Sequence, residues 1–110
     1  MSTSVASHLP AEIESQRAEI AEICARFGVR RLELFGSAAT GAFDAARSDL
    51  DFMVEFDAAR PLRPLEQYFG LKEELEILFE RPVDLVEAGA STNRYFLESV
   101  NKSRRLLYAA

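Results

Sequence analysis

Apolar residues recur at helical spacing near the start of the chain, and charged residues, mostly glutamates, fill the positions between them. The apolar positions are Ile13, Ile20, Ile23, Cys24 and Phe27. Residues about three, four or seven positions apart lie on one face of a helix, so this segment predicts an amphipathic helix. Pro10 suits the first turn of that helix, and Gly28 suits its C-terminal end.

Three later segments have the patterns of β-strands. Residues 29–35 carry Leu32 and Leu34 on one face, and residues 83–86 are apolar except for Asp84. Residues 49–56 alternate strictly between two faces, as expected of a half-buried strand. One face carries Leu50, Phe52, Val54 and Phe56, and the other carries Asp49, Asp51, Met53 and Glu55.

A second long helix is predicted between the last two of these strands, after prolines at positions 61 and 64. The apolar stripe expected to face the core consists of Leu65, Tyr68, Phe69, Leu71, Leu75, Leu78 and Phe79. Arg81-Pro82 ends this helix.

A third helix is predicted from Asn93 to about Lys102, with Ser91 or Thr92 as its N-terminal cap. The last apolar segment, residues 104–108, is expected to form a short strand or a docked tail.

The alternation of helices and strands predicts a small α/β (α+β) domain, with a mixed sheet and helices packed against it. Residues 10–110 are expected to form this single domain, with at most one helical turn at residues 38–41. Residues 1–9 are expected to be a flexible tail. A chain of 110 residues is large enough to bury one core without disulfides.

The chain is acidic, with a net charge of −5 and a pI near 4.9. Sequence-independent binding to nucleic acid needs a basic surface, so direct nucleic-acid binding is not expected. The single cysteine, the mean hydropathy of −0.08 and the lack of a long apolar run favour a cytoplasmic protein that does not enter a membrane.

The carboxylates of residues 49–51 are the candidate chemical group. Asp49 and Asp51 project from the same strand face with Cβ atoms roughly 6 to 7 Å apart, where a divalent cation such as Mg²⁺ would offset their repulsion. Asp84 on another strand adds a third carboxylate, and three carboxylates can hold two divalent ions. Upstream, the Gly36-Ser37 turn is expected to leave its backbone N–H groups and one hydroxyl free for an anion, which indicates a nucleotide site.

Three short motifs together resemble the minimal nucleotidyltransferases of the DNA polymerase β superfamily. They are Leu34-Phe35-Gly36-Ser37, Ser48-Asp49-Leu50-Asp51 and Val83-Asp84-Leu85-Val86. The resemblance extends from about residue 10 to the C-terminus and implies a polymerase β-type nucleotidyltransferase fold. Members of this family are commonly MntA-type antitoxins. They are encoded beside a HEPN-domain (HepT-type) ribonuclease toxin, which they neutralise by transferring AMP from ATP to a tyrosine.

The resemblance also implies a role for each motif residue. Asp49 and Asp51 would bridge two Mg²⁺ ions, and Asp84 would hold the catalytic metal and help to deprotonate the acceptor hydroxyl. Gly36 would allow close approach of the ATP β- and γ-phosphates, and the Ser37 hydroxyl would hold them. A HEPN-domain toxin encoded nearby is the implied partner, in a hetero-oligomer with this chain.

One departure from the family pattern affects catalysis. Many relatives carry basic residues directly after the Gly-Ser turn, where this chain has Ala38 and Thr40. Phosphate charge would then be met by metal, by backbone N–H groups or by a more distant arginine such as Arg47 or Arg94.

Two other functions stay open at the level of the sequence. The chain could be a binding module that silences the toxin by complex formation without catalysis, which the missing basic residues would favour. It could also be a free-standing transferase acting on a small alcohol or an antibiotic. The clustered aspartates favour the enzyme that modifies a protein partner, because a pure binding module does not need them and the short chain has no room for an acceptor domain.

Overall fold

The computed structural model describes residues 11–36, 49–57, 63–90 and 92–110. Its helices are α1 (Ala11–Glu14), α2 (Arg17–Arg26), α4 (Pro64–Phe79) and α5 (Arg94–Ser103), and its strands are β1 (Val29–Phe35), β2 (Leu50–Phe56), β3 (Val83–Glu87) and β4 (Arg105–Ala109). The predicted tail and the predicted turn at residues 38–41 lie outside the described residues. Among the helices that the structure describes, none is long and apolar enough to cross a membrane.

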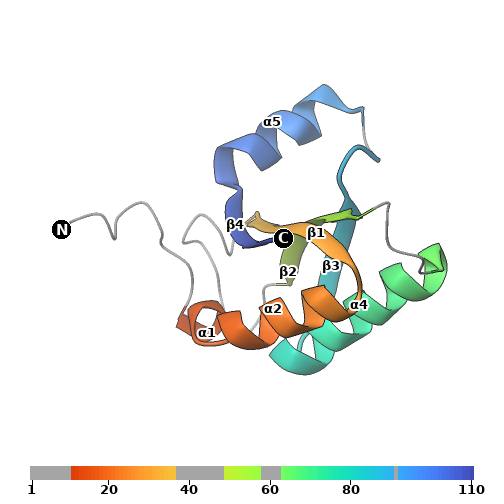
Figure 1. Cartoon of the computed structure of the whole chain (residues 1–110). Coiled ribbons are helices and arrows are strands. Elements are labelled where there is room, and N and C mark those ends of the chain that lie inside the picture. The colour runs from red at the N-terminus through yellow and green to blue at the C-terminus, as the bar shows by residue number, and fades with distance from the viewer. Residues whose placement is uncertain (1–10, 37–48, 58–62, 91) are drawn as a thin grey trace.

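The strands form one mixed sheet in the order β3-β2-β1-β4. β1 is antiparallel to both β2 and β4, whereas β2 and β3 are parallel and are joined through α4. Figure 1 shows α2 and α4 covering one face of this sheet and α5 lying over the other. The predicted small domain with a mixed sheet and packed helices is therefore confirmed.

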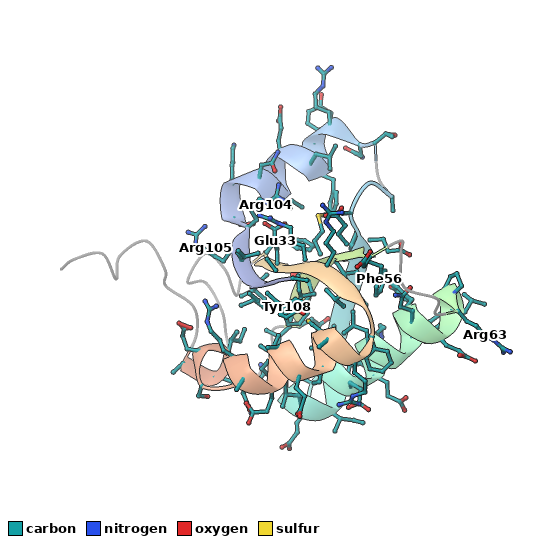
Figure 2. The ribbon with its side chains drawn as sticks, in the orientation of Figure 1. Glu33, Phe56, Arg63, Arg104, Arg105 and Tyr108 are labelled. Carbon is teal, nitrogen blue, oxygen red and sulfur yellow. The ribbon has the colours of Figure 1, made fainter. Side chains whose placement is uncertain are left out.

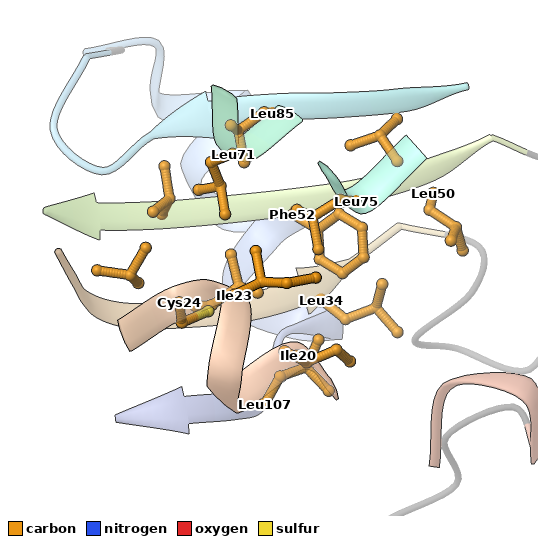
Figure 3. Packing of buried hydrophobic residues seen from close by; sticks show 14 of the residues in the cluster. Ile20, Ile23, Cys24, Leu34, Leu50, Phe52, Leu71, Leu75, Leu85 and Leu107 are labelled. Carbon is orange, nitrogen blue, oxygen red and sulfur yellow. The ribbon is translucent and has the colours of Figure 1, made fainter. Parts of the chain in front are cut away.

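The main core fills the space between the sheet and the helices α2 and α4 (Figure 3). The strict alternation predicted for residues 49–56 places Leu50, Phe52 and Val54 in this core with no exposed surface. Cys24 is also fully buried, and burial raises the pKa of its thiol to about 12. The cysteine is thus a small core residue, as its place on the apolar stripe predicts.

A smaller apolar cluster lies on the opposite face of the sheet, under α5. Phe35, Met53 and Val100 form it, and Phe96 packs edge-on against Phe35 with 5.8 Å between the ring centroids. Met53 belongs to the same face of β2 as Asp51, so α5 covers the part of the sheet next to the aspartates.

An ion pair with a buried carboxylate fixes the end of α5 to the sheet. Arg104, directly after the helix, donates to both carboxylate oxygens of Glu33 at 2.6 and 3.0 Å, and Arg31 donates to Glu33 at 3.4 Å. Figure 2 shows Arg104 and Glu33 facing one another between α5 and the sheet. Burial alone would raise the pKa of Glu33, but the hydrogen bonds and positive charges of the two arginines hold it below its ordinary value.

The first helix differs from its prediction, because it is interrupted after Glu14. The Ser15 hydroxyl donates to the backbone carbonyl of Glu12 at 3.2 Å, and Gln16 takes a non-helical backbone conformation before α2 begins. A serine that bonds to nearby backbone competes with the helical pattern, which accounts for the break. Ile13 stays fully buried despite it.

Two further predictions about the helices are wrong in detail. Leu65 and Phe69 of α4 are 72% and 59% exposed, because the sheet covers only the face of α4 that carries Leu71 and Leu75. The N-terminal cap of α5 is neither Ser91 nor Thr92 but Asn93. Its side-chain oxygen accepts from the backbone N–H groups of Tyr95 and Phe96 at 2.9 and 3.2 Å.

Candidate active site

The carboxylates predicted to act together come from neighbouring strands at one end of the sheet. In the parallel pair β2–β3, Asp51 lies directly opposite Asp84, and on its other side Asp51 lies opposite Phe35 of β1. Neighbouring strands are about 4.8 Å apart, and paired residues project from the same face. The sheet register therefore places the Asp51 and Asp84 side chains next to one another, with Asp49 two residues before Asp51.

The electrostatics of Asp51 reflect an interaction among these three carboxylates. Partial burial, the negative charges of Asp84 and Asp49, and a hydrogen bond with Asp84 raise the pKa of Asp51 from 3.8 to about 6. A carboxyl group next to like charges favours its protonated form, which can donate to a neighbouring carboxylate. Asp84 is exposed at the second position of β3, so its carboxylate is open to water.

The donor chemistry of this cluster suits a hard divalent cation. Mg²⁺ prefers carboxylate oxygens, and positive charge between the aspartates would remove the repulsion on Asp51. Within the described residues, no three histidine, cysteine, aspartate or glutamate side chains are already drawn together in the geometry of a metal site.

Gly36 ends β1 beside this cluster, and its glycine identity has a specific cause. Its backbone φ is +76°, a left-handed conformation that favours glycine. A Cβ atom at this position would lie 2.4 Å from Oδ2 of Asp51, which is too close for any side chain. The Asp51 carboxylate thus occupies the space that a side chain of residue 36 would need.

The expectation that the Gly36 backbone N–H is free for an anion is wrong. This N–H donates to the hydroxyl oxygen of Ser103 at 3.1 Å, at the end of α5. Ser37 and Arg47 lie outside the described residues, so their roles toward phosphate stay predictions.

Arg94, the other arginine considered for phosphate binding, lies at the far end of α5 from the Gly36 turn. It begins α5, whereas Ser103, the residue that touches Gly36, ends the same helix. At 1.5 Å per residue, the two ends of α5 are roughly 13 Å apart along the helix axis. Arg94 therefore does not lie beside the Gly36 turn.

Ser103 is the residue next to the site that the sequence analysis missed. It is only 5% exposed and follows Phe96 and Val100 at helical spacing, so a polar residue on the buried face of a helix was the available signal. The predicted end of the helix at about Lys102 left Ser103 outside it.

Comparisons with known proteins show the family and the fold of this chain. The sequence model of the nucleotidyltransferase domain family matches residues 17–109. A solved structure assigned as a minimal nucleotidyltransferase is 32% identical, with a TM-score of 0.70 over 90% of this chain and 97% of that one. Among curated proteins, none matches this chain in sequence.

Two complexes also share the fold. A toxin–antitoxin structure with AMP-PNP is 22% identical, with a TM-score of 0.64 over 86% of this chain and 73% of that one. A complex of the tri-AMPylated HEPN toxin of Shewanella oneidensis with its MNT antitoxin contains a chain that is 18% identical, with a TM-score of 0.61 over 89% and 73%.

Proposed function

The chain belongs to the nucleotidyltransferase domain family, and we propose that it transfers AMP from ATP to a tyrosine hydroxyl of a HEPN-type ribonuclease toxin, which it thereby neutralises. The observation that carries the proposal is the register of β2 and β3, which pairs Asp51 with Asp84; burial and the charges of Asp84 and Asp49 raise the pKa of Asp51 there. Placing Asp51 beside Asp84 costs free energy in the metal-free protein, and nucleotidyl transfer through a divalent metal would account for keeping both carboxylates there.

The aspartates would hold Mg²⁺, with Asp49 and Asp51 between two ions and Asp84 at the catalytic one. Bound Mg²⁺ would supply charge neutralisation of the triphosphate and a lower pKa for the acceptor hydroxyl. The Asp84 carboxylate is exposed, so it can accept the proton of an incoming hydroxyl from another chain.

The proposed reaction replaces a phosphoanhydride bond of ATP by a phosphate ester bond to tyrosine. The tyrosine oxygen forms a bond to the α-phosphorus of ATP while the bond between that phosphorus and the bridging oxygen of the β-phosphate breaks. Diphosphate leaves with the electrons of the broken bond, and the tyrosine proton passes to the Asp84 carboxylate. Neither an oxidant nor a further co-reactant is needed.

The choice of a HEPN toxin as acceptor rests on two supports. The three motifs resemble those of MntA-type antitoxins, and the fold matches chains found in toxin–antitoxin complexes, one of which contains an AMPylated HEPN toxin.

The test is incubation of the purified protein with Mg²⁺, labelled ATP and the protein encoded by the neighbouring gene, followed by intact-mass measurement. We expect the neighbour to gain one or more AMP units with the wild type and none with the double variant Asp49→Ala, Asp51→Ala. Glu55→Gln is the matched control, because Glu55 is an exposed carboxylate on the same face of β2.

Each other outcome identifies a different function. Transfer by the double variant at the wild-type rate would show that the aspartates are not the metal ligands. No mass gain, together with a stable complex that blocks ribonuclease activity, would show that the chain is a binding module. Transfer to a small alcohol or antibiotic, and none to the neighbour, would identify a free-standing transferase.

A further inference from the structure

We propose that Ser103 is a positioning residue of the nucleotidyl-transfer site: by holding the Gly36 turn, it keeps the Asp51 carboxylate in its metal-binding orientation. The inference deepens the proposed function and rests on it for its catalytic consequence. Its structural basis is a contact between residues 67 positions apart, the 3.1 Å hydrogen bond from the Gly36 N–H to the Ser103 hydroxyl oxygen.

The hydroxyl of Ser103 is oriented to accept this bond. It has one proton, and it donates that proton within α5, to the backbone carbonyl of Ser99 at 3.2 Å or of Val100 at 3.5 Å. The oxygen lone pairs then remain for the Gly36 N–H. Because Ser103 is 5% exposed, water cannot easily replace it as acceptor.

Gly36 transmits this constraint to Asp51 by direct contact. The position that a Cβ of residue 36 would occupy is 2.4 Å from Oδ2 of Asp51 and 3.2 Å from its Cγ. The Asp51 carboxylate therefore fills the space on the open side of the Gly36 backbone, where a side chain would otherwise stand. A displacement of this backbone would allow Asp51 to rotate away from Asp84.

The support behind Ser103 is rigid. The next residue, Arg104, is bound to the buried carboxylate of Glu33, and Val100 and Phe96 pack into the small cluster with Phe35. The last turn of α5 is thus attached to β1 on both sides of Ser103. A metal ligand held through such a fixed outer contact keeps its geometry when the metal binds.

The first experiment tests the contact in metal-free protein, by amide hydrogen exchange at Gly36 measured with NMR. We expect exchange of the Gly36 N–H to be at least about tenfold faster in Ser103→Ala than in wild type, since the variant lacks the acceptor. Ser103→Thr keeps the hydroxyl and should restore slow exchange. Ser99→Ala makes the same chemical change at an exposed position of the same helix and should leave Gly36 unaffected.

The second experiment tests the consequence for the metal. In the transfer assay, the Mg²⁺ concentration for half-maximal activity should rise roughly tenfold or more in Ser103→Ala, which is the usual effect of removing an outer contact of a metal ligand. At saturating Mg²⁺, the rate should return to near the wild-type value. A purely structural role would instead lower the melting temperature and leave the Mg²⁺ dependence unchanged.

The two readouts separate failure of this inference from failure of the proposed function. Unchanged Gly36 exchange in Ser103→Ala would overturn the inference, whether or not the protein has transferase activity. Faster exchange with an unchanged Mg²⁺ requirement would also overturn it, because Asp51 would then not depend on the turn. If wild type transfers no nucleotide at all, the proposed function fails, and Mg²⁺-induced shifts of the Gly36 and Asp51 amide signals, present in wild type and weakened in Ser103→Ala, decide the inference instead.

Discussion

Replacing Asp51 by asparagine should make the metal-free protein more stable while it abolishes transfer. The asparagine side chain carries no charge, so both the burial of a charge and the repulsion from Asp84 and Asp49, which together raise the pKa of Asp51, would disappear. Its amide N–H₂ can also donate to the Asp84 carboxylate, as the protonated form of Asp51 does. The metal site would lose one of its anionic ligands at the same time.

The size of the gain follows from the pKa. The pKa of Asp51 rises from 3.8 to about 6, and each unit of difference between the folded and unfolded chain is worth about 1.4 kcal/mol, so a fully shielded group would give about 3 kcal/mol. Because the carboxylate is only partly buried, screening by water reduces this to about 1 to 2 kcal/mol. For a domain of this size, that raises the melting temperature by roughly 5 to 10 °C.

The gain should depend on pH in a defined direction. The folded chain binds the Asp51 proton more tightly than the unfolded chain, so the wild type loses stability as the pH rises from about 4 to above about 6. The stability difference between the Asp51→Asn variant and wild type should be full at about pH 7.5 and should vanish at about pH 4.

Thermal unfolding in the presence of a chelator, across this pH range, measures the effect. Glu55→Gln removes the same charge from an exposed position on the same face of β2 and should change the melting temperature little at any pH. Added Mg²⁺ should stabilise wild type and Glu55→Gln but not Asp51→Asn. The reasoning would be refuted if Asp51→Asn did not raise the melting temperature at neutral pH, or raised it equally at about pH 4 and about pH 7.5.

Three further variants test other contacts of the structure. Gly36→Ala should leave the domain folded but displace the Asp51 carboxylate, so Mg²⁺ should no longer raise its melting temperature; a normal Mg²⁺ response would contradict the 2.4 Å approach. Glu33→Gln should cost about 1 to 3 kcal/mol near pH 7 by breaking the pair with Arg104. Since the pKa of Glu33 is lowered in the folded chain, this cost should shrink as urea unfolding is repeated below about pH 4, and a pH-independent cost would count against it. Asn93→Ala should cost about 1 kcal/mol in the same urea measurement, because α5 loses its cap.

The sheet and its aspartates could be predicted because both depend on a short period. Alternation with period two assigns every position from 49 to 56 to one face of a strand. The apolar run at residues 83–86 is enough to place Asp84 on another strand. A helix between two strands favours their parallel pairing in any small mixed domain. The pairing of Asp51 with Asp84 follows from these local rules once the register is known.

The helices were less predictable because periodicity gives the direction of a side chain but not the extent of the surface that covers it. Leu65 and Phe69 belong to the expected stripe, yet they point away from the face of α4 that carries Leu71 and Leu75 and packs on the sheet, so they stay exposed. The break after Glu14 depends on whether Ser15 bonds to water or to the backbone, which spacing does not decide.

The motif alone does not reveal why glycine stands at position 36. Its left-handed φ alone would tolerate asparagine as well as glycine, since asparagine also enters that region. Asparagine, like every residue except glycine, carries a Cβ and would displace the Asp51 carboxylate. The bond to Ser103 uses the one backbone N–H that an approaching phosphate would need from this residue. Glycine in the Leu-Phe-Gly-Ser motif is therefore favoured here by its left-handed φ and by the carboxylate of Asp51, which is distant in sequence.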